Sequence, residues 1–295
     1  LIIRISLMKK YLIATVSLCL IGCGSVFASI WTPVTELSTR KSDRTSRFVN
    51  EILYKADESE LRQLLSSKNR GTELVLEIPM PDGGFRKFRM KPGTLLPETL
   101  RQKYPSISVF SGVATDDPNL SISADMTLYG FHAMVFDGVK TYMIDPIDNQ
   151  QSGVYTVHYK NDEIREAPSG PGIGHCQTQN VLPINEDVVQ LKGTASSNVV
   201  INGSVLRTYR LALACSHQYA EAVTNKVSPT KEEVLSKMTT TINRVNGIYS
   251  KEIAVSLQFV ENEDTIIFNT ALNDPYSAAD DARNAYALVD INQQT

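Results

Sequence analysis

The sequence predicts a fold of mixed α+β and α/β class, in which a β-rich unit precedes a strand-helix-strand unit. Short runs of alternating apolar and polar residues, separated by Gly, Pro, Asn and Asp, recur from residue 73 to residue 159 and are typical of short strands. Beyond residue 205, an apolar run, a long helical repeat and a second alternating run follow in order. This order predicts a βαβ unit with a right-handed crossover.

The N-terminal residues predict an export signal. Lys9 and Lys10 precede the apolar run of residues 11–21, which is too short to span a membrane and is typical of a secretory signal. Met8 is then expected to be the true start, with residues 1–7 upstream of it. The signal peptide is predicted to comprise residues 1–28.

Two ways of processing this signal are considered. Small residues precede the bond between Ala28 and Ser29, where a signal peptidase would cut. Leu20-Ile21-Gly22-Cys23 is instead similar to a bacterial lipobox, which would leave Cys23 acylated and the protein on the outer membrane or cell surface. Cleavage after Ala28 is preferred, and it would make the protein extracellular. No stable membrane association is expected unless Cys23 is lipidated.

A helix and a hairpin are expected early in the β-rich unit. Leu61, Leu64 and Leu65 recur at helical spacing and predict a helix over residues 57–67. The next two strands, at residues 73–79 and 85–90, flank a Pro-Asp-Gly-Gly turn in which Gly allows a positive φ. Five further strands are expected at residues 107–113, 120–124, 130–136, 140–144 and 153–159.

A capping box marks the start of the long helix. Thr230 and Glu233 stand three residues apart, so each side chain can accept a hydrogen bond from a backbone amide at the helix start. The residues that follow recur at steps of three and four, which predicts one buried face. That face comprises Val234, Leu235, Met238, Thr241, Ile242, Val245, Ile248 and Tyr249.

Strands are predicted on both sides of this helix. Residues 209–215 are almost continuously apolar, interrupted only by Arg210, which is typical of an interior strand. Apolar residues at every second position from 253 to 259 predict a strand with one covered face. A final helix is expected within residues 277–295 from a weaker apolar spacing.

Composition is typical of a folded, soluble protein. Hydrophobic residues make up 42% of the chain and charged residues 21%, so there is enough apolar material for a core. The formal charge is -3 and no long basic block is present, which argues against nucleic acid as a partner.

Several segments resemble a family of secreted proteases. Residues 206–214 read Leu-Arg-Thr-Tyr-Arg-Leu-Ala-Leu-Ala, the helix closes on Arg-Val-Asn-Gly-Ile-Tyr at 244–249, and the strand at 253–260 follows. This order resembles the opening of the reprolysin-like (adamalysin-type) metzincin domain of bacterial secreted zinc metalloproteases. Residues 77–84 and 129–134 look like the propeptide of the same group, and the start Ile-Trp-Thr-Pro at residue 30 agrees with cleavage after Ala28.

The resemblance implies the N-terminal fragment of a zymogen. Residues 29–164 would form a β-rich propeptide domain, residues 165–204 a linker that contains the activation cleavage, and residues 205–295 the truncated first part of the peptidase domain. The full-length protein would be a secreted zinc-dependent metalloendopeptidase precursor that hydrolyses peptide bonds with a zinc-activated water. Its partners would be protein or peptide substrates, and the propeptide would bind its own catalytic domain.

Two cysteines remain after the signal is removed. The resemblance implies that Cys176 is a cysteine switch, whose thiolate would occupy the open coordination position of the zinc ion. Cys176 could instead be a free thiol in a Gly/Pro-rich loop, or form a disulfide with Cys215, which an exported protein permits. Cys215 is otherwise expected to be a small buried hydrophobe.

The zinc ligands of a metzincin are expected C-terminal to Thr295. The family places two His at i and i+4 around a Glu, with a third His after a Gly turn, and none of the four histidines at 132, 158, 175 and 217 fits that spacing. The 295-residue chain is therefore predicted to hold no catalytic residue, to bind no zinc and to be inactive. Arg210 stands where a Ca²⁺-binding carboxylate occurs in animal relatives, so no calcium site of that type is expected.

Two further points complete the prediction. The acidic groups at Glu261, Glu263 and Asp264 and at Asp280-Asp281 are expected to be solvated helix starts or loop faces. The alternative function is an exported β-rich binding or inhibitory module with no catalysis.

Overall fold

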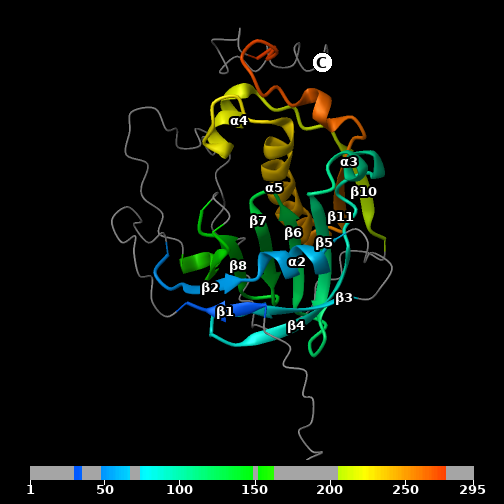
Figure 1. Cartoon of the computed structure of the whole chain (residues 1–295). Helices are drawn as coiled ribbons and strands as arrows, with labels where there is room; N and C mark the ends of the chain where they lie inside the picture. Colours follow the sequence, from blue (N-terminus) through cyan, green and yellow to red (C-terminus); the bar gives the residue numbers. More distant parts are fainter. Residues whose placement is uncertain (1–29, 35–47, 67–73, 149–151, 163–204, 277–295) are drawn as a thin grey trace, which may run out of the picture.

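The computed structural model describes residues 30–34, 48–66, 74–148, 152–162 and 205–276 (Figure 1). Within them, nine strands form one antiparallel, nearly closed, barrel-like sheet, and a small parallel sheet with helices follows. The β-rich first unit and the strand-helix-strand second unit are thus confirmed. The helix expected within residues 277–295 lies outside the described residues.

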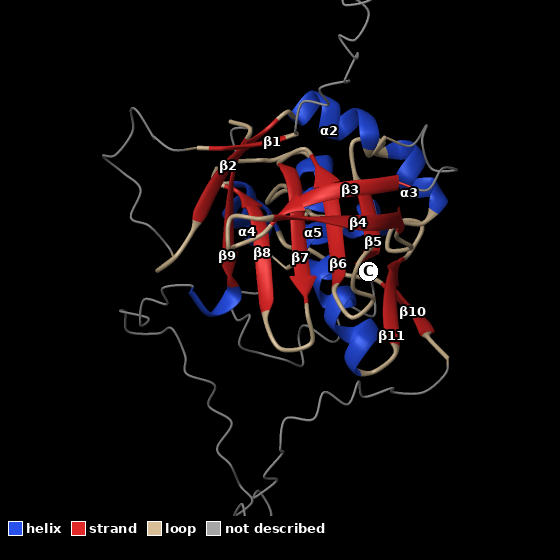
Figure 2. Ribbon diagram, turned by 90° about the horizontal axis from the view of Figure 1, so that it is seen from below, coloured by secondary structure: helices blue, strands red, loops and turns tan. Residues whose placement is uncertain are grey.

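The large sheet has the strand order β1-β2-β9-β8-β7-β6-β5-β4-β3, with every neighbouring pair antiparallel. Each of its seven sequence-predicted strands is present, with its bounds within three residues of those expected. In Figure 2, β3 and β4 cross over the other strands, which shows how strongly the sheet curls. The strands are β1 (Trp31–Pro33), β2 (Ile52–Ala56), β3 (Leu74–Pro79), β4 (Phe85–Pro92), β5 (Ser108–Ala114), β6 (Ser121–Thr127), β7 (Gly130–Phe136), β8 (Thr141–Pro146) and β9 (Val154–Tyr159).

The remaining elements connect or follow this sheet. The helix α2 begins after Asp57, whose carboxylate accepts a hydrogen bond from the Glu60 amide, so the first predicted helix is confirmed. The helix α5 begins with the predicted capping box, and the strands on either side of it pair in parallel. The bounds are α2 (Glu58–Leu64), α3 (Glu98–Lys103), η2 (Lys160–Asp162), β10 (Arg207–Leu211), α4 (His217–Thr224), α5 (Lys231–Glu252), β11 (Val255–Phe259) and η4 (Glu263–Ile266).

Trp31 joins the two edges of the large sheet. β1 and β3 are its outermost strands, and the indole Nε1 of Trp31 donates a hydrogen bond of 2.9 Å to the carbonyl of Glu77 in β3. The side chain is 1% exposed, and its ring meets the edges of Phe131 and Tyr155 at centroid distances of 5.9 and 5.3 Å. A single side chain thus spans the gap that strand pairing leaves open.

The two faces of the sheet are buried in different ways. Side chains alternate along β6, so Ile122 and Ala124 point into the barrel core while Ser123 and Asp125 point outward to α5. The barrel core also receives Leu61 and Leu65 from the segment around α2. The helices α2 and α5 therefore contact opposite faces of the same sheet.

The predicted buried face of α5 is only partly right. Val234, Leu235 and Met238 are fully buried, but Thr241 is exposed and Tyr249 is 42% exposed. Four polar residues outside the predicted stripe are buried instead, namely Ser236, Thr239, Thr240 and Asn243. The reason is that α5 is covered on two sides, by an apolar cluster and by β6, so its buried surface is wider than an apolar stripe indicates.

The prediction of an interior strand over residues 209–215 is wrong. β10 ends at Leu211, and four of its five residues are exposed. Among the described strands β10 pairs only with β11, so it is an edge strand, and only Leu211 at its end is partly buried. Further along, Cys215 forms an isolated bridge with Ile267 and is buried there.

Gly112 marks a close approach between β5 and β4. A Cβ at this position would lie 2.6 Å from the Arg89 carbonyl oxygen and 2.9 Å from the Met90 sulfur. Because the carbonyl belongs to a paired strand, Gly112→Ala is expected to lower the free energy of unfolding by about 2 kcal/mol. Urea denaturation followed by far-UV circular dichroism measures this. Ser111→Ala, one residue away, is the control, and an equal loss in both variants would contradict the prediction.

Candidate functional site

The β-rich unit and the strand-helix-strand unit share a hydrophobic core. Leu95, Leu96, Leu100 and Tyr104, in and around α3, belong to the same buried cluster as residues of α5 and β11. Val234, Leu235 and Met238 of α5 are fully buried within that cluster. The apolar face of α5 is therefore covered by residues that precede it by more than a hundred positions. The members contributed by the second unit are Cys215, Ala220, Val234, Leu235, Met238, Ile242, Phe259 and Ile267.

A buried polar group joins α5 to the outer face of β6. Asp125 is 1% exposed, and its carboxylate accepts hydrogen bonds from the Thr240 hydroxyl at 2.6 Å and the Asn243 amide at 3.3 Å. The Asn243 amide also donates to the Ala124 carbonyl, and the Ser123 hydroxyl donates to the Asn243 carbonyl, both at 2.9 Å. Buried polar groups that satisfy one another in this way set the position of the helix on the sheet.

A second polar group joins the segment around α3 to η4. The Asp264 carboxylate binds the Lys103 ammonium and accepts a hydrogen bond of 2.9 Å from the Tyr104 hydroxyl, and Lys231 donates to the Asp264 carbonyl. Burial opposes ionisation of Asp264, but the hydrogen bonds from Lys103 and Tyr104 hold its pKa below the usual value. This ion pair connects the two units at neutral pH.

The acidic residues of η4 correct a prediction. Glu263 is 0% exposed and Asp264 is also buried, so neither is the solvated loop residue that was expected, whereas Glu261 is exposed. One Glu263 oxygen accepts a hydrogen bond of 2.9 Å from the Leu213 amide, and the other has no partner among the described residues. Burial raises the pKa of Glu263 to about 7. The negative charge of Asp264 also raises this pKa, whereas the hydrogen bond from the Leu213 amide lowers it. Asp280 and Asp281 lie outside the described residues.

Glu263 is expected to make stability depend on pH. Its pKa of about 7 in the folded chain exceeds the ordinary value of 4.5, so the stability contributed by the bound proton is present below pH 4.5 and lost as the pH rises through 7. Glu263→Gln imitates the protonated acid. The variant is expected to match the parent near pH 4.5 and to be more stable by up to about 3 kcal/mol at pH 8. Urea denaturation at both pH values measures the difference, and an equal difference at both would contradict the prediction.

The described histidines occupy structural positions. His217 begins α4, and its Nδ1 lies 2.5 Å from the buried Asp274 carboxylate, which also accepts a hydrogen bond from the His217 amide. In the large sheet, His132 Nδ1 lies 3.2 Å from Asp125 and the His158 ring stacks on Phe48. The described part of the chain contains no group of three or more His, Cys, Asp or Glu side chains that could hold a metal ion.

Of the sequence-predicted site residues, the structure describes few. Cys176, Cys23, Ala28 and Ser29 all lie outside the described residues. Cys215 is 3% exposed and unpaired, and burial, reinforced by the Asp274 charge, raises the pKa of its thiol to about 12. The expectation of a small buried hydrophobe at this position is confirmed.

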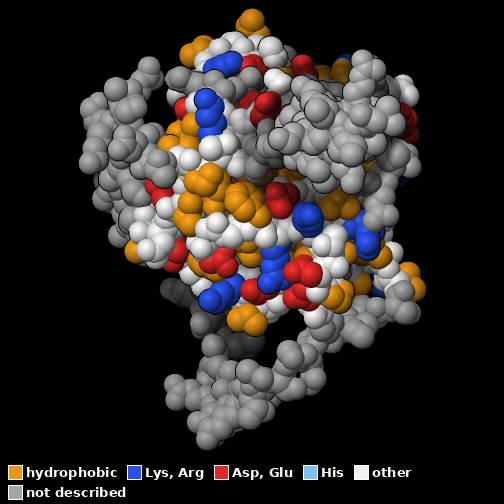
Figure 3. Space-filling view, turned by 60° about the horizontal axis from the view of Figure 1, so that its bottom comes forward, with side chains coloured by type: hydrophobic (Ala, Val, Ile, Leu, Met, Phe, Trp, Pro, Cys, Tyr) orange, Lys and Arg blue, Asp and Glu red, His pale blue; other side chains and the backbone are white. Residues whose placement is uncertain are grey.

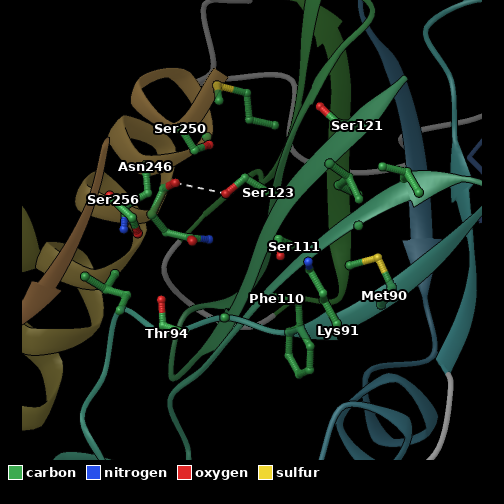
Figure 4. A pocket seen from close by; sticks show the side chains of 18 of the residues that line it. Met90, Lys91, Thr94, Phe110, Ser111, Ser121, Ser123, Asn246, Ser250 and Ser256 are labelled. Atoms are coloured by element: carbon green, nitrogen blue, oxygen red, sulfur yellow. Dashed lines mark hydrogen bonds between the residues drawn. The ribbon is translucent and has the colours of Figure 1, made fainter. Parts of the chain in front are cut away.

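A large pocket lies between the outer face of the sheet and the C-terminal half of α5. Its volume is about 920 Å³, which is in the range of ligand-binding sites. The lining comes from β4 to β7, α5 and β11, elements that no local motif connects, and the sequence therefore offered no signal for it. In Figure 4, Asn246, Ser250 and Ser256 face Lys91, Ser111 and Ser121 across the opening.

Comparison with known proteins gives no identification. No protein-family model matches the chain, and no curated protein matches it either. None of the helices in the described residues has the length and apolar character needed to cross a membrane.

Proposed function

We propose that this chain is the N-terminal part of a secreted zinc metallopeptidase precursor, in which the β-rich unit is a propeptide that holds the first part of the peptidase domain. The observation that carries the proposal is the shared core. Residues 95–109 of the β-rich unit bury the apolar face of α5, and Asp125 pairs with Thr240 and Asn243 on the same helix. A propeptide that supports folding needs such an interface with the domain that follows it.

The strand-helix-strand unit supports the same proposal. β10 and β11 pair in parallel with α5 as the crossover, in the order that the metzincin resemblance implies. The described residues do not supply a zinc-ligand set, so the proposal places zinc and the catalytic groups in a longer precursor and assigns no catalytic step to this chain. Bound there, zinc would activate the water that attacks the peptide bond. Secretion follows from the predicted signal with cleavage between Ala28 and Ser29, or lipidation at Cys23.

The first test is the nucleotide sequence beyond the codon for Thr295. The proposal expects an open frame that encodes His-Glu-x-x-His, followed by a Gly and a third His, within about 100 residues. A stop codon directly after Thr295 would refute it. Purified 295-residue chain is expected to contain no stoichiometric zinc by atomic emission.

The second test addresses Cys176 in the full-length precursor. If its thiolate occupies the zinc, Cys176→Ser is expected to raise the peptidase activity of the uncleaved precursor at least about tenfold, because the open coordination position then accepts water. Cys215→Ala is the matched control, since it removes the buried thiol and leaves Cys176 in place. Equal activity of the two variants and the parent would exclude the switch.

The pocket favours a second candidate function, an exported binding module. A volume of about 920 Å³ is more than a packed helix-sheet contact requires. This candidate predicts a ligand for the 295-residue chain, whether or not the precursor is a peptidase.

A further inference from the structure

The pocket is built from two walls of different chemistry. One wall is the outer face of the sheet, where β4 to β7 present residues at every second position. The other wall is the last two turns of α5 together with Ser256 of β11. Asn246 holds these two elements together, because its side-chain amide exchanges hydrogen bonds of 2.7 and 2.8 Å with both backbone groups of Leu257. These bonds hold the two parts of the second wall together, and the hydrogen bond from the Ser123 hydroxyl to the Asn243 carbonyl joins that wall to the sheet.

The charge of the pocket has one sign. Arg89, Lys91 and Lys251 line it, and none of the aspartates and glutamates in the described residues does. Burial lowers the pKa of Lys251, and the opposing charge comes from Asp137, which lies outside the lining. The whole chain has a formal charge of -3, and basic and acidic side chains are interspersed on the face shown in Figure 3. The pocket thus concentrates positive charge on a slightly negative protein, which favours an anionic ligand.

The uncharged lining is suited to a polypeptide. Within the described part of the chain, the hydroxyls of Ser111, Ser121 and Ser250 make no hydrogen bond, so they can donate to or accept from a bound backbone. Apolar surface lies beside them at Val113, which is 38% exposed, and at the partly buried Phe136. The Lys251 ammonium lies 4.6 Å from the Phe136 ring centre, so apolar and charged groups adjoin in the lining.

We propose that this pocket binds an extended, acidic peptide segment of a partner protein. Carboxylates of the peptide contact Lys91 and Lys251, its backbone meets the serine hydroxyls, and an apolar side chain packs on Val113 and Phe136. A nucleic acid fits less well, because three cations neutralise few phosphates and binding of nucleic acid rests on many such contacts. The inference does not depend on the proposed peptidase function.

The test uses the whole purified chain and a fluorescein-labelled octapeptide of alternating Glu and Leu, read by fluorescence anisotropy. Binding is expected in the micromolar range, weaker as salt rises, and absent for a peptide with Gln in place of Glu. Lys91→Gln/Lys251→Gln is expected to weaken binding about tenfold, since two charge contacts are lost. Lys87→Gln is the matched control, because Lys87 is exposed on β4 but does not line the pocket. Fluorescence of Trp31, the only tryptophan, verifies that each variant is folded.

Four results would overturn the inference. The first is equal binding of the Glu and Gln peptides, and the second is equal affinity of the Lys91→Gln/Lys251→Gln and Lys87→Gln variants. The third is displacement of the peptide by a sulfated oligosaccharide at lower concentration than by unlabelled peptide, which would identify the pocket as a glycan site. Dimers in sedimentation that the peptide does not dissociate, together with no peptide binding, would assign the pocket to a second copy of the chain.

Discussion

Trp31→Ala is expected to lower the free energy of unfolding by about 3–5 kcal/mol, the largest effect of any single change considered. The variant loses the ring that fills the space beside Phe131 and Tyr155, and it also loses the hydrogen bond to Glu77 across the seam between β1 and β3. Among the described strands no pairing bridges that seam, so the edges of the sheet are expected to separate. Urea denaturation followed by far-UV circular dichroism measures the loss.

Two control variants separate the contributions of Trp31. Trp31→Phe keeps an aromatic ring but loses the Nε1 donor. It is expected to lower the free energy of unfolding by less than half as much as Trp31→Ala does. Tyr209→Ala removes an aromatic side chain that is 52% exposed on β10, and it is expected to change stability by less than about 0.5 kcal/mol. If Trp31→Ala behaved like Tyr209→Ala, the side chain would not close the barrel.

Asp125→Ala is expected to lower the free energy of unfolding by about 3 kcal/mol. The change leaves the buried Thr240 hydroxyl and Asn243 amide with fewer partners and removes the carboxylate beside His132. Asp116→Ala is the control, because that carboxylate is exposed and its 3.5 Å pair with Arg86 is on the surface.

The same variant tests whether the two units unfold together. Trp31 fluorescence reports the β-rich unit, and the helical circular dichroism signal reports mainly α5, the longest helix described. Because the units share a core, both signals are expected to have the same midpoint in the parent, and Asp125→Ala should shift both equally. A shift of the helical signal alone would show that the units unfold separately, and it would remove the main support for a propeptide role.

The elements of the fold were predictable wherever a local pattern determines them. The turn between β3 and β4 depends on Gly83, whose φ is 88°. The start of α5 depends on Thr230 and Glu233, which lie within one helical turn of each other. The partners of each element were not predictable in this way. Asp125 and Thr240 are 115 positions apart, and neither carries a pattern that indicates the other.

The candidate sites illustrate the same limit. An acidic run such as Glu263-Asp264 is usually solvated, and here it is buried because the chain brings the Leu213 amide and Lys103 onto it from 50 and 161 positions away. Likewise, Lys91 and Lys251 line one pocket only because the packed chain places β4 and α5 on its two walls. Burial of a side chain, and the approach of residues that lie far apart in the sequence, depend on how the whole chain packs. A pattern within a few residues does not reveal them.

The small sheet is open to extension on one side only. The far edge of β11 is occupied, since the Phe259 amide donates to the Leu95 carbonyl at 2.8 Å and the Gln258 side chain donates to the Thr94 carbonyl at 2.9 Å. β10 has no second neighbour among the described strands, and its residues are exposed. An additional strand can therefore join only beside β10. The β-rich unit therefore blocks strand pairing at the β11 edge and leaves it possible at the β10 edge.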